Sequence, residues 1–172
     1  MRKNSREFYS IRLPIVTEKT AHDSWHQDWD KHMEVIRKIN KFPDALVTKD
    51  SSIVLKRAMY KLALYFQREF GYDYIQYDVN SKNNYIGYMW TDGAIVIGAC
   101  LFWWSDEDEC WRMNWAWFHP YLRDKKLLSE SWNYFIERHG KFDVDLPLSN
   151  NMKAFLIKKK YEGPSFTYKD LI

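Results

Sequence analysis

Cysteine is scarce in this sequence, which contains only Cys100 and Cys110 among its 172 residues. Two cysteines cannot build the disulfide framework that stabilises a small secreted domain. No apolar run approaches the length of about 20 residues that a membrane-spanning helix needs. The first residues, Met1 to Arg6, lack the apolar stretch of a secretion signal. We therefore expect a cytoplasmic protein with no membrane partner.

A large excess of charge of one sign is also missing. The net charge of +3 is too small to predict a nucleic-acid partner by itself. Internal repeats and low-complexity linkers are absent, and the length suits one domain with its own core, so we expect a single domain over 1–172. Aromatic residues are abundant, with nine Trp, twelve Tyr and ten Phe. Most should lie in the core, and others could line an acceptor pocket.

Spacings of three and four residues predict two helices in the first seventy residues. The first begins near Asp23 and ends before Pro43. The second runs from about Ser51 to Phe70, and Gly71 follows it where a left-handed residue is expected. We interpret residues 1–70 as a helical N-terminal elaboration, which could cover the active site or mediate a homodimer.

Strand signals begin after Gly71. Aromatic and β-branched residues and a hairpin signal at Asp92-Gly93 predict an antiparallel meander, followed by alternating helices and strands. The predicted strands are 72–79, 85–90, 94–104, 110–119, 142–146 and 161–168, and the helices are 123–139 and one capped by Ser149. This order predicts an α+β (mixed α/β) domain with a central, mostly antiparallel sheet flanked by helices.

The segment that joins strand 110–119 to helix 123–139 carries the strongest functional signal. The N–H groups at a helix N-terminus, together with the helix dipole, suit a phosphate or pyrophosphate. Arg123, Lys125 and Lys126 would add positive charge at the same point. The alternative is a basic first turn that is merely solvated.

This segment resembles the signature region of the GNAT superfamily of N-acetyltransferases. In that family the fourth strand leads into a loop of Arg or Gln, two variable residues, Gly, one further residue, and Gly or Ala. Residues 123–128 read RDKKLL, so Arg123 matches, and Lys126 and Leu128 replace the two small residues. A similar basic, glycine-free loop occurs in the cohesin acetyltransferases.

A second similarity lies further along the chain. GNAT sequences often continue with a strand, an Asn-containing helix start and the pattern Phe/Leu-Tyr-Glu-Lys-x-Gly-Phe. Residues 155–161 read FLIKKKY, in which Lys158 matches and Leu156 replaces a Tyr that is frequently the general acid. Ser149 replaces the Asn. The resemblance covers about 72–168, which we expect to form the acetyl-CoA-binding core.

The resemblance implies an N-acetyltransferase that uses acetyl-CoA as co-substrate and transfers the acetyl group by direct attack of an amine. Pantetheine would lie between the splayed fourth and fifth strands. The residues implied in cofactor binding are Trp117, Phe118 and His119 on the strand and Arg123, Asp124, Lys125, Lys126, Leu127 and Leu128 around the pyrophosphate.

The chemistry needs a base for the attacking amine and an acid for the leaving thiolate. His119 could titrate near neutral pH, or it could simply end a strand before Pro120. Ser149 could donate to the thiolate, or it could be a plain N-cap. Asp78 could reach an acceptor amine, or it could be a turn carboxylate.

Other functions remain open at this stage. One is a catalytically weak or inactive GNAT-fold binding module, and another is a nucleic-acid partner bound by the lysines of 125–126 and 158–160 and by exposed aromatic residues. The acceptor could be a small-molecule or peptide amine, a protein lysine or an aminoacyl-tRNA. His22, His26 and His32 include an i, i+4 pair on one helix face, but no cysteine or clear third ligand accompanies them, so we expect no metal site.

Overall fold

The structure is a computed structural model that describes residues 13–14, 42–92 and 95–172. The helix expected from Asp23, the histidines His22, His26 and His32, and the tip of the 92–95 hairpin lie outside these residues. Among the described helices, none combines the length and the apolar character that crossing a membrane requires.

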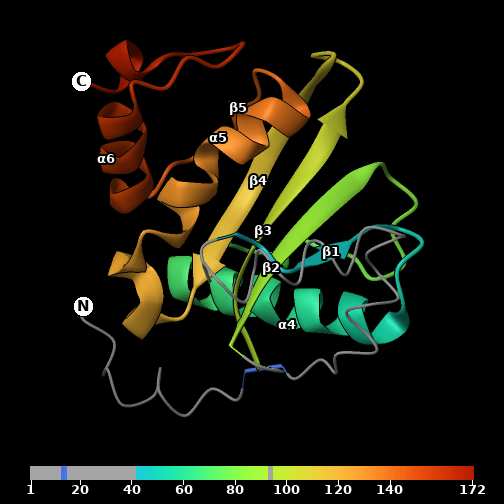
Figure 1. Cartoon of the computed structure of the whole chain (residues 1–172). Helices are drawn as coiled ribbons and strands as arrows, with labels where there is room; N and C mark the ends of the chain where they lie inside the picture. Colours follow the sequence, from blue (N-terminus) through green and yellow to red (C-terminus); the bar gives the residue numbers. More distant parts are fainter. Residues whose placement is uncertain (1–12, 15–41, 93–94) are drawn as a thin grey trace.

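A five-stranded sheet in the order β1-β2-β3-β4-β5 forms the centre of the described part (Figure 1). The strands are β1 (Ala45–Val47), β2 (Tyr85–Asp92), β3 (Ile95–Ser105), β4 (Cys110–Phe118) and β5 (Asp143–Val144). The first four are antiparallel neighbours, and β5 pairs with β4 in parallel. The expected α+β fold with a mostly antiparallel sheet is therefore confirmed.

Helices cover both faces of the sheet. On one face, α4 (Ile53–Phe70) buries Met59 and Leu62 in a core that also contains Trp115 and Trp117 of β4. On the other face, α5 (Leu127–His139) and α6 (Asn150–Lys159) enclose a second core. That core is rich in aromatic side chains, with Tyr88, Trp90, Phe102, Trp132 and Phe135 all buried.

The ends of α4 follow the sequence signals closely. The side chain of Ser52, one residue after the predicted start, accepts a hydrogen bond from the Leu55 amide. Gly71 has the left-handed conformation (φ 74°) that glycine adopts without steric cost, as predicted. Capping signals thus located this helix to within two residues.

Three expectations were wrong. Residues 72–79 form an irregular loop rather than a strand, because Tyr72, Ile75 and Val79 pack against the first core without pairing to a neighbouring strand. Residues 161–168 contribute only a single bridge between Glu162 and Thr167. The helix expected from Arg123 begins at Leu127, because 120–125 forms a 3₁₀ turn and Lys126 is left-handed.

Candidate functional site

The sheet opens where β4 and β5 separate. The two strands pair only at Arg112 with Asp143 and at Met113 with Val144. The ladder with β3 pairs Leu101 with Trp115 and Phe102 with Met113, so Asn114 is the extra residue of a bulge in β4. From Asn114 to Phe118, β4 runs on without β5 beside it.

Asp145 holds this point of separation. Its amide donates to the Met113 carbonyl (2.9 Å), which is the last contact that follows the strand pairing. Its carboxylate accepts three hydrogen bonds, from Trp103 Nε1 (2.9 Å), Arg112 Nε (2.7 Å) and Asn114 Nδ2 (2.7 Å). Donors on β3 and β4 therefore fix the residue at which β5 leaves the sheet.

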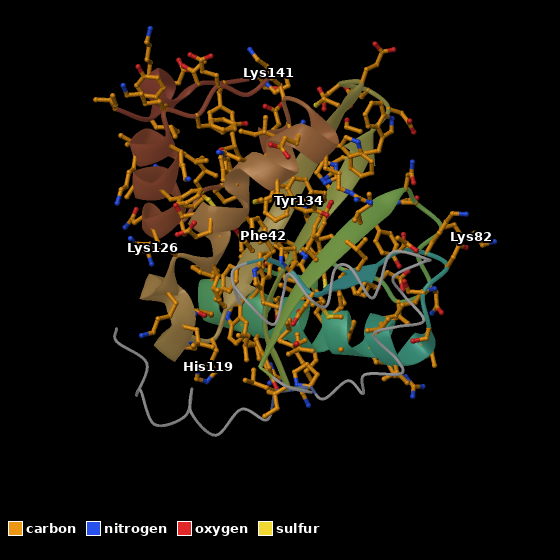
Figure 2. All side chains as sticks on the ribbon, viewed as in Figure 1. Phe42, Lys82, His119, Lys126, Tyr134 and Lys141 are labelled. Atoms are coloured by element: carbon orange, nitrogen blue, oxygen red, sulfur yellow. The ribbon has the colours of Figure 1, made fainter. Side chains whose placement is uncertain are left out.

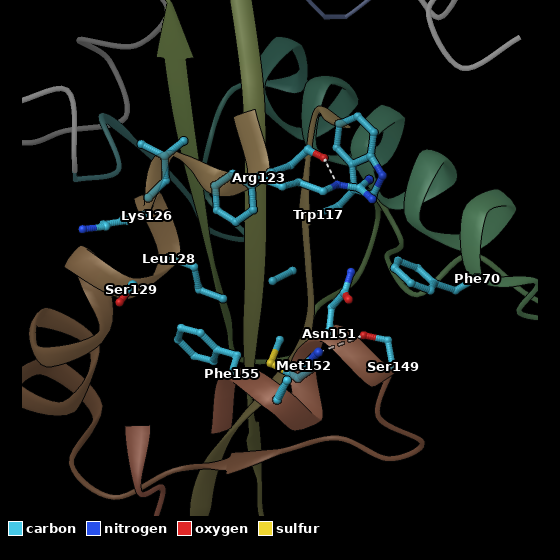
Figure 3. Close-up of a pocket in the computed structure, with 14 residues that line it drawn as sticks. Phe70, Trp117, Arg123, Lys126, Leu128, Ser129, Ser149, Asn151, Met152 and Phe155 are labelled. Carbon is cyan, nitrogen blue, oxygen red and sulfur yellow. Dashed lines mark hydrogen bonds between the residues drawn. The ribbon is translucent and has the colours of Figure 1, made fainter. Parts of the chain in front are cut away.

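A cavity of about 400 Å³ occupies the space beyond this separation. Such a volume lies within the usual range for small-molecule sites, about 300–1,000 Å³. In Figure 3, Met152 and Phe155 of α6 face Arg123 and Trp117 across the hollow. The lining comes from the end of α4, the free part of β4, the start of α5 and the start of α6: Phe70, Ala116, Trp117, Phe118, Arg123, Lys126, Leu127, Leu128, Ser129, Ser149, Asn151, Met152, Ala154 and Phe155.

The N-terminus of α5 lies at one side of this cavity. Its N-cap, Lys126, has φ 64° and ψ 15° and makes no side-chain capping hydrogen bond. Leu127, Leu128 and Ser129, whose amides belong to the uncapped first turn, all line the cavity. Amides in such a turn lack partners within the helix and carry the positive end of its dipole, so this wall suits an anionic group.

Arg123 lines the same cavity, but Glu69 holds its guanidinium group. Nη1 and Nη2 donate to the two carboxylate oxygens of Glu69 (2.5 and 2.6 Å), and Nε donates to the Phe118 carbonyl (3.0 Å). The indole of Trp117 also donates to Glu69 (2.8 Å). Arg123 therefore joins α4 to the end of β4, a role that the loop motif did not predict.

Glu69 itself was missed by sequence reasoning. It is the only acidic residue of α4, whose other charged residues are all Lys or Arg. A lone carboxylate in the last turn of a basic helix was a signal for a cationic partner. That partner could not be chosen from the sequence, because Arg123 lies 54 residues further along the chain.

The two candidate catalytic residues lie in different places. Ser149 lines the cavity, and its Oγ accepts a hydrogen bond from the Met152 amide (3.2 Å) as the N-cap of α6. His119 is half-buried at the end of β4, with its amide donating to the Ile97 carbonyl (2.9 Å), and it is not among the lining residues. Burial, followed by the charge of Arg123, lowers the pKa of His119 below its usual 6.5.

The structure brings most of the predicted cofactor-binding residues together. Trp117, Phe118, Lys126, Leu127 and Leu128 line the cavity with Arg123. Lys125 is exposed just beside it, and the side chain of Asp124 lies outside the described part of the chain. Leu156, at the position where the family pattern often has Tyr, is fully buried in the second core. Among the described residues, no cluster of His, Cys, Asp and Glu could hold a metal ion.

Comparisons with known proteins find similarity in structure but not in sequence. No protein-family model matches the sequence, and no curated protein matches it. The structure is similar to that of a ribosomal-protein-alanine N-acetyltransferase from Brucella melitensis biovar Abortus 2308. The TM-score is 0.49 at 10% identity, over 71% of this chain and 91% of that one.

Proposed function

We propose that the protein is an N-acetyltransferase that binds acetyl-CoA in the cavity beside β4. One observation carries the proposal. A strand edge left free by its neighbour and a helix N-terminus without a side-chain cap line the same hollow. Those are the two features that a pantetheine arm and a pyrophosphate require, and the sequence resemblance to GNAT enzymes covers the same residues.

The proposed donor site has two parts. The edge of β4 beyond Met113, which β5 does not pair, can hydrogen-bond the amides of pantetheine as an added strand would. The first turn of α5 and the ammonium groups of Lys125 and Lys126 would hold the pyrophosphate. Lys126 has the left-handed conformation at the position where the family pattern has glycine, so the backbone keeps the bend without the glycine.

The proposed reaction is a direct acyl transfer. The amine nitrogen attacks the thioester carbonyl carbon, the C–N bond forms as the C–S bond breaks, and coenzyme A leaves as a thiol. In this proposal Ser149 would supply the thiol proton, since its oxygen accepts the Met152 amide and its hydroxyl hydrogen remains available to donate. His119, at the end of β4 and outside the cavity lining, is the proposed base, and its lowered pKa favours the neutral imidazole that accepts a proton.

The first test is calorimetric titration with acetyl-CoA. We expect micromolar binding to the wild type and at least tenfold weaker binding to the Lys125→Ala, Lys126→Ala double variant. Lys141→Ala is the matched control, since Lys141 is exposed and projects from another side of the molecule (Figure 2). Absence of binding at millimolar acetyl-CoA would refute the proposal, and binding without transfer to any amine would leave a binding module.

A further inference from the structure

A second hollow lies on the α4 face of the sheet. It has a volume of about 300 Å³ and lies between the loop 74–83 and strands β2, β3 and β4. Its aromatic lining comes from Tyr74, Tyr77, Tyr85 and Trp103. Tyr77 and Tyr85 are buried and share a hydrogen bond between their hydroxyl groups (3.1 Å), while Tyr74 is 69% exposed at the rim. The hollow is therefore an aromatic recess with one exposed tyrosine at its mouth.

A single carboxylate lines this hollow among the described residues. Among the described residues that line it there is no Lys or Arg, and Asp78 supplies a carboxylate. One oxygen of Asp78 accepts the Asn80 amide (2.9 Å), which fixes the carboxylate in its turn. Burial raises the pKa values of Tyr77 and Tyr85, so both phenols are neutral hydroxyl groups.

Aromatic faces and a carboxylate without competing cations favour a positively charged ligand. A phosphate-bearing ligand would find no cation among the described lining residues to neutralise it. The side-chain oxygen Oε1 of Gln76, which also lines the hollow, is buried and accepts no hydrogen bond from the described residues. An unsatisfied carbonyl oxygen is a further site for a donor such as an ammonium group.

The two hollows approach each other along one strand. Asn114 of β4 lines the hollow on the α4 face, and Ala116 of β4 lines the proposed donor cavity. Two positions of an extended strand span about 7 Å. The hydrogen bond from the Tyr72 hydroxyl to the Pro147 carbonyl (3.1 Å) connects the loop after α4 to the segment after β5. A ligand in one hollow would thus lie close to a ligand in the other.

We infer that the hollow formed by Tyr74, Tyr77, Asp78 and Trp103 binds the acceptor, and that the acceptor is a primary ammonium group on an alkyl chain. This inference rests on the proposed acetyltransferase function. A free diamine and the lysine side chain of a peptide share this chemistry, and both fit a recess of this size.

The test measures initial rates of acetyl transfer at saturating acetyl-CoA. The acceptor is 1,5-diaminopentane in one arm and a peptide with a blocked N-terminus and one lysine in the other. The variants are Asp78→Asn, which keeps the oxygen that accepts the Asn80 amide, and Tyr74→Ala, which removes an exposed ring. We expect each to raise the KM for the amine at least fivefold with unchanged acetyl-CoA affinity. Glu137→Gln, which changes an exposed carboxylate of α5 outside the lining, is the control and should leave the KM unchanged.

The outcomes separate this inference from the function on which it rests. Acetyl-CoA binding with an amine KM that neither variant changes would overturn the acceptor site and leave the enzyme. No acetyl-CoA binding to the wild type would overturn the proposed function and the acceptor role together. If the variants raise the KM for only one of the two acceptors, the result would support the site and would identify the source of the ammonium group as a free amine or a peptide.

Discussion

Acidification should expose the cost of burying His139. Its side chain is only 8% exposed, its ring stacks on Phe102 with centroids 4.4 Å apart, and its Nε2 shares a 2.7 Å hydrogen bond with the Tyr88 hydroxyl. Burial, followed by the charge of Arg138, lowers the pKa of His139 to about 4. The imidazole is therefore neutral in the folded protein over a pH range in which it is charged in the unfolded chain.

The sign follows from the lowered pKa. Above pH 6.5 the imidazole is neutral in both states, so the full stability is present. As the pH falls toward 4, the unfolded state binds a proton that the folded state does not, and stability is lost. The loss is about 2 kcal/mol at pH 5 and about 3 kcal/mol at pH 4, at about 1.4 kcal/mol for each tenfold change in proton affinity.

Asp44 opposes this effect and must be separated from it. Burial raises the pKa of Asp44 to about 6, so its protonation on acidification favours the folded state. The pH dependence of the wild type alone would therefore conceal the histidine. Urea unfolding of the wild type and of His139→Gln, measured at pH 7, 5 and 4, removes the Asp44 contribution by difference.

We expect the difference in unfolding free energy between the two proteins to shrink by about 2 kcal/mol from pH 7 to pH 5, because only the wild type has the titrating imidazole. A difference that stays constant over this range would refute the assignment of a lowered pKa to His139. An NMR titration of the His139 ring in the wild type gives the same pKa without any substitution.

Substitutions at three positions test the walls of the donor cavity. Lys126→Gly removes the left-handed strain of φ 64° and should stabilise the fold by up to about 1 kcal/mol. The lost charge should weaken acetyl-CoA binding in calorimetry, and unchanged binding would show that the Lys126 ammonium group does not contact the ligand. Ser149→Ala should lower kcat and destabilise the fold by about 1 kcal/mol. Ser149→Asn should lower kcat but keep the N-cap hydrogen bond of α6, and full activity of this variant would exclude Ser149 as the acid. A Cβ at Gly98 would come within 2.2 Å of the Phe118 ring. Gly98→Ala should therefore destabilise the protein by about 1–3 kcal/mol and weaken acetyl-CoA binding. If the variant keeps the melting temperature and the acetyl-CoA affinity of the wild type, the Phe118 ring moves aside freely.

Local signals predicted the order of the elements well. The hairpin at 92–95, the acidic turn at 106–109 and the capping residues Gly71 and Ser149 each depend on a few neighbouring residues. The loop 72–79 misled the prediction, because apolar side chains that press a loop onto a core alternate much as those of a strand do. Three-residue β1 gave too short a pattern to detect.

The site was predictable only where it is continuous in sequence. The strand-to-helix segment identified Trp117, Phe118, Lys126 and Leu128, which do line one cavity. The partner of Arg123 could not be predicted, because Glu69 reaches it only through the packing of α4 on the sheet. The hollow on the other face likewise combines a loop with three strands, so only the assembled fold defines it.

The three hydrogen bonds to Asp145 have a consequence for the kinetics of association. They tie the end of β5 to β3 and β4, so protein groups alone fix the residue at which the strands separate and the opening beside β4 begins. A preorganised cleft loses little conformational entropy on binding, and its association rate should be limited by diffusional encounter rather than by rearrangement of the protein. Weakening this clamp would convert a rigid receptor into one that must be opened by its ligand, with a slower association rate at the same set of contacts.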